Sequence, residues 1–214
     1  MSVLDLFDKL DWDGIVDHYH TRLHIHETLV SFFKNDDLIK FSDLLVGVSD
    51  IHGNYSARDH DLGPRILNEN SNSRNRLYEV SDQFLRLDNA KTVPNIIRNA
   101  GIKYFQISVG SEASCMLNPT VCWITNVRTV WAHLVLKHGG SVSEANAELE
   151  LYRDGEEDSM MAYNKWRAIH QEMKNNLNEI NRISMEYLES DKSQAESINY
   201  LWSDAISSAL YDAN

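Results

Sequence analysis

Arg128 and His133 lie five positions apart in a stretch of the sequence that is otherwise mostly apolar. An imidazole can transfer a proton near neutral pH, and a guanidinium can hold the negative charge that builds on a phosphorus atom. Together these two groups are the minimum needed to cleave a phosphodiester bond without a metal ion. Asn126 is a nearby polar residue that could support the pair. The spacing therefore predicts a catalytic site at Arg128 and His133.

The segment 128–133, Arg-Thr-Val-Trp-Ala-His, resembles the short signature of HEPN ribonucleases, in which an arginine and a histidine are separated by four to six residues. Arg128, Ala132 and His133 match, whereas Thr129 stands where many members carry asparagine. The resemblance implies a helical bundle and metal-independent cleavage of RNA. His133 would be the general acid or base, and Arg128 would stabilise the phosphorane oxygens. Because family members usually pair two motifs across a dimer, a homodimer is implied as well.

Helix geometry leaves a second interpretation of this pair open. Positions five apart on a straight helix point about 140° away from each other, because the helix has 3.6 residues per turn. The two side chains could still meet if the arginine bends back, if the helix starts nearer Arg128, or if a second subunit contributes its copy. The alternative is structural, with Arg128 ion-paired at a helix surface and His133 hydrogen-bonded in the core.

Six of the nine histidines lie between positions 18 and 60, which raises the question of a metal site. On a helix, Asp17, His20 and His24 fall within about 60° of one another, as ligands that share an ion must. That face lies opposite the apolar stripe of the same helix, and the spacing identifies no further ligand. We therefore favour a solvated polar face and predict neither a metal nor another cofactor.

The doublet His60-Asp61 resembles the core of HD-domain phosphohydrolases, which are helical and bind metal through such a doublet, a further histidine and a distant aspartate. The resemblance implies metal-dependent hydrolysis of phosphoesters, with His24 or His26 as the upstream ligand. In that family the doublet usually follows a buried apolar helix, whereas a polar segment precedes it here.

Residues 49–54, Ser-Asp-Ile-His-Gly-Asn, resemble the first motif of calcineurin-like metallophosphoesterases. In that family the aspartate and the histidine follow a β-strand, whereas helical periodicity precedes Asp50 here. The later motifs of the family are absent from the sequence. We therefore treat this resemblance as accidental.

The chain has 214 residues and a net charge of −12, with 32 acidic and 20 basic side chains. Its length suits one sizeable core, or at most two small ones. The charge argues against broad binding of nucleic acid, which needs clustered lysine and arginine. It allows RNA to enter a local basic pocket, and it also suits docking on a basic protein.

The compartment is expected to be the cytoplasm. The spacing of Cys115 and Cys122 fits neither a zinc knuckle nor a redox CxxC pair, so we expect both to be reduced. The first residues are acidic and have no long apolar core, so we expect no signal peptide. No stretch approaches the roughly 18 apolar residues of a membrane span, so we expect no membrane partner.

Apolar residues at three-to-four spacing predict the helices that must position these candidates. Few prolines and glycines interrupt them, with 3 and 9 in the chain. We expect helices over 13–34, 37–48, 77–89, 94–100, from Asn118-Pro119 to Gly139-Gly140, 141–153, 159–189 and 194–211.

Two segments depart from this pattern. Residues 49–76 are polar and turn-rich, which predicts the longest loop of the chain, with room for one short helix. Within 102–109, Phe105, Ile107 and Val109 alternate with polar residues, which predicts one short strand without an evident partner. The predicted fold is otherwise all-α: a single domain, 1–214, folded as one bundle of about six to eight helices.

Three functions remain open at this point. The first is a HEPN-like endoribonuclease acting on RNA, for which a toxin or defence system is one setting. The second is a non-enzymatic acidic protein that binds, and could inhibit, a basic or nucleic-acid-handling protein. The third is an HD-type phosphohydrolase that uses His60 and Asp61. The sequence identifies neither the RNA target nor the partner.

Overall fold

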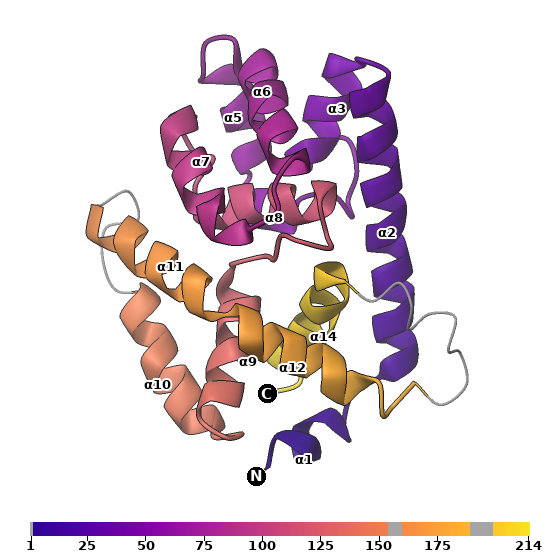
Figure 1. The fold of residues 1–214 in the computed structure, drawn as a ribbon, viewed down its shortest axis with the longest axis vertical. Coiled ribbons are helices and arrows are strands. Elements are labelled where there is room, and N and C mark those ends of the chain that lie inside the picture. The colour runs from indigo at the N-terminus through magenta and orange to yellow at the C-terminus, as the bar shows by residue number, and fades with distance from the viewer. Residues whose placement is uncertain (1, 154–159, 189–198) are drawn as a thin grey trace. The chain divides into compact units, whose positions relative to one another are not determined.

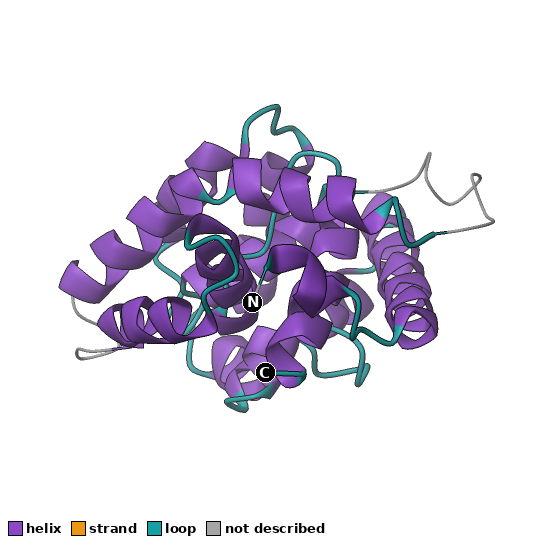
Figure 2. Ribbon diagram, turned by 90° about the horizontal axis from the view of Figure 1, so that it is seen from below, coloured by secondary structure: helices purple, strands orange, loops and turns teal. Residues whose placement is uncertain are grey.

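The computed structural model describes residues 2–153, 160–188 and 199–214. Within these ranges the chain forms thirteen α-helices and one short 3-10 helix and contains no strand (Figures 1 and 2). The predicted all-α class is confirmed, with more helices than the six to eight expected. Of the described helices, not one combines the length and the apolar character that crossing a membrane requires.

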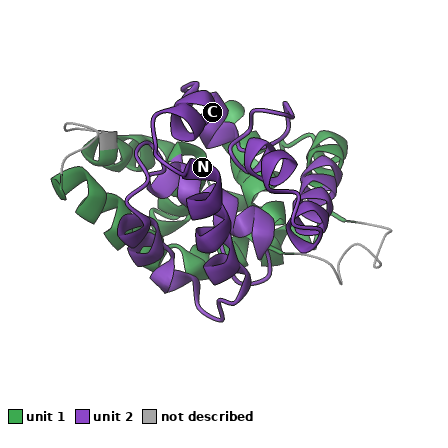
Figure 3. Ribbon diagram, turned by 90° about the horizontal axis from the view of Figure 1, so that it is seen from above, with its two compact units in different colours: residues 1–19, 127–214 green, residues 20–126 purple. Residues whose placement is uncertain are grey.

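The chain divides into two compact units (Figure 3). Unit 1 consists of residues 1–19 and 127–214, and unit 2 of residues 20–126. The helix α2 (Trp12–Lys34) begins in unit 1 and continues into unit 2. No change of composition in the sequence marks the division, and the assignment of 1–214 to one domain stays a prediction.

Unit 2 is built around a buried helix, α8. Besides most of α2, its elements are α3 (Leu38–Leu45), α4 (Tyr55–Arg58), α5 (Leu62–Asn68), α6 (Ser73–Leu85), the 3-10 helix η1 (Ala90–Thr92), α7 (Val93–Ala100) and α8 (Ile107–Leu117). α4, α6 and α7 pack against α8, and Figure 1 shows α6 and α7 beside it. α8 is buried along nearly its whole length. Any charged side chain on α8 must therefore find its partner inside the unit.

Unit 1 is built around α9. Its helices are α1 (Val3–Phe7), the first turns of α2, α9 (Val127–Lys137), α10 (Val142–Arg153), α11 (Met160–Glu172), α12 (Lys174–Ser184) and α14 (Tyr200–Asp212). α10, α12 and α14 pack against α9, whose residues 129–135 are all buried. This enclosure explains why α9 is apolar nearly all round, since a helix with no polar face belongs inside a protein.

The loop predicted over 49–76 is wrong. α4 and α5 lie within it, and α6 begins at Ser73. The two short helices have four and seven residues, too few for a helical repeat of apolar residues to show in the sequence. Each still buries an apolar residue, Ala57 on α4 and Ile66 on α5. Arg58 on α4 and Arg65 and Asn68 on α5 are exposed, and these polar positions produced the loop-like composition.

The strand predicted over 102–109 is also wrong. Residues 102–106 are irregular, with a turn at 103–104, and α8 begins at Ile107. Tyr104 has a φ of +68°, in the left-handed region that a strand does not use. Phe105, Ile107 and Val109 are all buried, so their alternation reflects a turn and a helix that both face the core.

The remaining helix predictions agree with the structure to differing degrees. Those over 13–34, 37–48, 77–89, 94–100 and 141–153 are confirmed, with shifted ends. The helix expected from Asn118 begins only at Val127, because the Asn118 amide donates to the carbonyl oxygens of Phe84 and Leu87 at 3.1 Å each and holds the chain in an irregular path. The helix expected over 159–189 is divided at Met173. Residues 194–198 of the last predicted helix lie outside the described ranges.

Candidate functional site

Arg128 lies in the first turn of α9, at the surface of unit 1. Its side chain is 42% exposed, and its Nη1 donates to Oδ2 of Asp212 on α14 at 3.3 Å. An ion pair this exposed contributes little to stability, because water screens it. Arg128 is therefore held at the surface by a weak, structurally ordinary contact.

His133, in contrast, is 4% exposed. The side-chain Nδ2 of Asn176, on α12, donates to the main-chain oxygen of His133 at 3.0 Å and lies 3.1 Å from its Nδ1. Since a carbonyl oxygen can only accept, this contact fixes the amide orientation and makes Nδ1 an acceptor as well. The hydrogen of the neutral ring then belongs on Nε2, which is buried and has no hydrogen-bond partner among the described residues.

This environment keeps the imidazole uncharged. Burial, together with the positive charge of nearby Lys137, lowers the pKa of His133 from its usual 6.5 to about 4. A desolvated ring resists protonation because its charged form loses the hydration that water would provide. At neutral pH His133 is thus a neutral core residue that does not face solvent.

The structure does not bring the two predicted catalytic side chains together. They lie five positions apart on one helix and bind different neighbours, Arg128 to Asp212 on α14 and His133 to Asn176 on α12. This matches the structural interpretation of the pair, an arginine ion-paired at a helix surface and a histidine hydrogen-bonded in the core. Asn126, the supporting residue, is half-buried just before α9 begins. The ribonuclease function itself stays a prediction.

The histidines of α2 do not gather further ligands. Asp17, His20 and His24 are all exposed. Across the described ranges, no group of three or more histidine, cysteine, aspartate or glutamate side chains is placed to hold a metal ion. The structure thus shows these residues on an exposed face, as the polar-face interpretation expects.

The His60-Asp61 doublet lies in the turn between α4 and α5. Both residues are exposed, and Asp61 has a φ of +50° at the start of α5. Nδ1 of His26, one proposed upstream ligand, lies 2.6 Å from the main-chain oxygen of Met116 and so donates to it. That nitrogen already has a structural partner in the core of unit 2.

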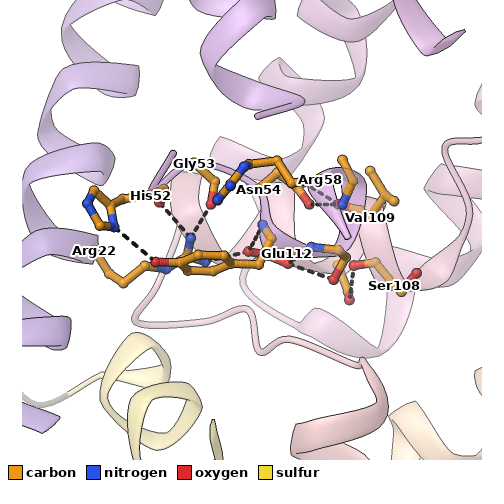
Figure 4. A network of polar contacts seen from close by, with 12 residues as sticks. Arg22, His52, Gly53, Asn54, Arg58, Ser108, Val109 and Glu112 are labelled. Carbon is orange, nitrogen blue, oxygen red and sulfur yellow. Dashed lines mark hydrogen bonds and ion pairs between the residues drawn. The ribbon is translucent and has the colours of Figure 1, made fainter. Parts of the chain in front are cut away.

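The residues that sequence reasoning missed form a buried polar network in unit 2 (Figure 4). Arg22 of α2 and Glu112 of α8 form an ion pair of 2.7 Å, with side chains 0% and 1% exposed. Glu112 also accepts from the main-chain nitrogens of Tyr55 and Ser56 at 2.8 and 2.9 Å, and from the Ser56 hydroxyl at 2.7 Å. These amides open α4, so the carboxylate also caps that helix and faces the positive end of its dipole.

Arg22 joins a third segment to this pair. Its Nη1 donates to the main-chain oxygens of His52, at 3.1 Å, and of Gly53. Its guanidinium lies 4.9 Å from the centre of the Tyr55 ring, whose hydroxyl is 3.2 Å from Nδ1 of His52 (Figure 4). One arginine therefore anchors α2, the turn at 52–53 and the start of α4.

Asn54 completes the network. Its amide donates to the main-chain oxygens of Leu45 and Val109 at 3.2 and 2.9 Å, and its Oδ1 accepts from the nitrogen of Ala57 at 3.0 Å. The residues that resemble a metallophosphoesterase motif thus have structural roles as a joint between helices. Glu112 was the available signal, a lone carboxylate in a buried helix that must have a partner. Its partner lies 90 positions away and could not be identified by spacing.

Comparisons of the chain with protein-family models, with curated proteins and with solved structures gave no match. Function must therefore be argued from the chain's own residues.

The lowered pKa of His133 predicts that the stability of the fold decreases in acid. Because its pKa is about 4 when folded and about 6.5 when unfolded, the unfolded chain alone gains a proton as the pH falls between these values. This histidine should have no such effect above pH 6.5 and should destabilise the fold by up to about 3 kcal/mol as the pH falls to about 4. Urea unfolding of the wild type and His133→Gln across this range measures the difference. The exposed His24→Gln variant is the control, and equal pH dependence of both variants would contradict the assignment.

The Arg22–Glu112 pair predicts that removing a buried carboxylate destabilises the protein more than removing an exposed one. Glu112→Ala should destabilise the protein by about 3–5 kcal/mol in urea unfolding, because Arg22 is left buried and uncompensated. Arg22→Met combined with Glu112→Leu should lose less than Glu112→Ala, since no unpaired charge remains.

The matched control for this prediction is Glu69→Ala. Glu69 is 42% exposed and pairs with Lys103 at 3.1 Å. Its loss should destabilise the protein far less than the loss of Glu112, because water screens the exposed pair. If Glu69→Ala and Glu112→Ala prove equally destabilising, the buried network does not hold unit 2 together.

Proposed function

We propose that this protein is a non-enzymatic interaction protein whose acidic surface binds a basic protein partner. The observation that carries the proposal is the excess of exposed carboxylates. Within the described ranges, these carboxylates form no group that could hold a metal ion. A surface of one sign attracts an oppositely charged partner and raises the rate of encounter.

The first 19 residues, all in unit 1, display this excess most densely. α1, the turn that follows it and the start of α2 together carry one lysine, Lys9, and five aspartates that are all exposed: Asp5, Asp8, Asp11, Asp13 and Asp17. Local structure uses some of them, since Asp5 forms a capping box with Ser2 and Asp8 accepts from the Tyr187 hydroxyl at 2.7 Å. These contacts hold the carboxylates in place without neutralising them, because serine and tyrosine are uncharged donors.

The exposed face of α10 adds apolar contact area to the acidic charge. Glu144, Ala147, Glu150 and Leu151 are exposed on this helix, and Leu151 keeps 59% of its surface open. The opposite side of the helix buries Leu149 against the rest of unit 1. Apolar contact surrounded by charged groups is the usual composition of protein interfaces. α10 therefore suits a protein partner better than a small anion or a nucleic acid.

The competing function is that of a ribonuclease, which requires a different arrangement of side chains. Arg128 and His133 would have to face one phosphate, whereas the imidazole is buried and the guanidinium is paired with Asp212. A third function, metal-dependent hydrolysis at His60 and Asp61, needs ligands that the described ranges do not assemble.

The acidic surface predicts salt-dependent binding without turnover. A fluorescent hexapeptide of alternating arginine and glycine should bind in about 50 mM salt and weaken several-fold at 300 mM, because salt screens exposed charges. Neutralising Asp8, Asp13 and Asp17 to asparagine should slow association several-fold in stopped-flow measurements. RNA should stay intact, with EDTA or with magnesium.

A second triple variant controls for net charge alone. Asp59→Asn, Glu79→Gln and Asp88→Asn remove the same charge from exposed positions of unit 2. This variant should slow association less than the first. RNA cleavage in EDTA that disappears in folded His133→Ala would refute the proposal and establish the ribonuclease instead.

A further inference from the structure

A hollow of about 540 Å³ lies beside the acidic face of α10, within unit 1. α9, α10 and the C-terminal end of α14 contribute its lining: Trp131, Asn146, Ala147, Leu149, Glu150, Tyr211 and Asn214. Its size is within the range of about 300–1,000 Å³ that is typical of ligand pockets. Among the described residues, the side chains that line it include one carboxylate, two aromatic rings and two amides, and neither a lysine nor an arginine.

The aromatic side of the hollow is held in a fixed geometry. Nε1 of Trp131, a residue that is 2% exposed, donates to Oδ1 of Asn146 at 2.6 Å. The rings of Trp131 and Tyr211 are 5.6 Å apart and almost perpendicular, at 87°. Tyr211 is half-buried and is the ring on which a flat ligand can stack, whereas the enclosed Trp131, held by its bond to Asn146, supports that ring at its edge.

α10 supplies the charge of the lining. Glu150 is exposed on this helix and lines the hollow, while Asn146 and Asn214 provide polar groups. An anion would meet a carboxylate and no cation, and a purely apolar ligand would strip water from three polar side chains. A flat cation satisfies both sides, because it stacks on aromatic rings and forms paired hydrogen bonds with a carboxylate.

We infer that this hollow is the anchor site for an arginine side chain of the basic partner. The inference rests on the proposed function and specifies which group of the partner is recognised. Arginine fits better than lysine because its guanidinium is planar, presents a fork of donors to a carboxylate and loses its hydration more readily. The exposed Ala147 and Leu151 beside the hollow give the neighbouring residues of the partner an apolar surface.

The test compares two hexapeptides of equal charge, one alternating arginine with glycine and the other lysine with glycine. The arginine peptide should bind the full-length protein several-fold more tightly in fluorescence anisotropy. Glu150→Gln should weaken its binding about tenfold. Glu144→Gln removes the same charge from an exposed position of the same helix outside the lining, and should weaken binding less than about twofold. Tyr211→Leu should reduce the preference for arginine.

A second readout locates the peptide. The indole N–H signal of Trp131, assigned by its loss in Trp131→Phe, should shift during titration with the arginine peptide. The inference is overturned if both peptides bind equally, or if Glu150→Gln and Glu144→Gln behave alike; general binding to the acidic surface would still stand. If neither peptide binds in low salt, the proposed function fails together with the inference.

Discussion

The buried ion pair between Arg22 and Glu112 is the constraint on which the architecture of unit 2 depends. Both side chains are fully enclosed, 2.7 Å apart, and neither charge could be left alone in the core without a cost of several kcal/mol. Their remaining hydrogen-bonding groups reach the turn at 52–53 and the first amides of α4. A single set of contacts therefore fixes α2, α4 and α8. This explains how the polar segment 49–76 can contain short helices. Unit 1 has a smaller counterpart, the amide of Asn176 on His133, which joins α12 to α9.

The sequence predicted those parts of the fold that are encoded locally. α2 and α10 are amphipathic over several turns, and Ser141 caps the start of α10 through its hydroxyl, which accepts from the nitrogen of Glu144 at 3.4 Å. The segments that failed depend on distant partners. Residues 102–109 alternate as a strand does because a turn and a helix both face the core, and Asn118 delays α9 by binding main-chain oxygens more than 30 positions away.

The candidate site, like the fold, has features that local spacing reveals and features that depend on distant residues. Spacing identified Arg128 and His133 as unusual residues in an apolar helix, and both have partners there. It could not show that those partners, Asp212 and Asn176, lie on different helices and orient the two side chains separately. The surface charge, in contrast, was available from composition alone, and the structure adds where it is displayed. α9 belongs to the core of unit 1, and we propose that recognition is carried by the acidic residues of α1, α2 and α10.

The charge state of His133 distinguishes this account from a catalytic one most directly. Long-range proton–nitrogen NMR at pH 7 reports which ring nitrogen carries hydrogen, and whether an RNA oligonucleotide alters it. We expect a neutral ring with hydrogen on Nε2 and signals that RNA leaves unchanged. A ring that is charged at pH 7, or whose signals move when RNA is added, would contradict the assignment of His133 to the core and restore α9 as the active helix.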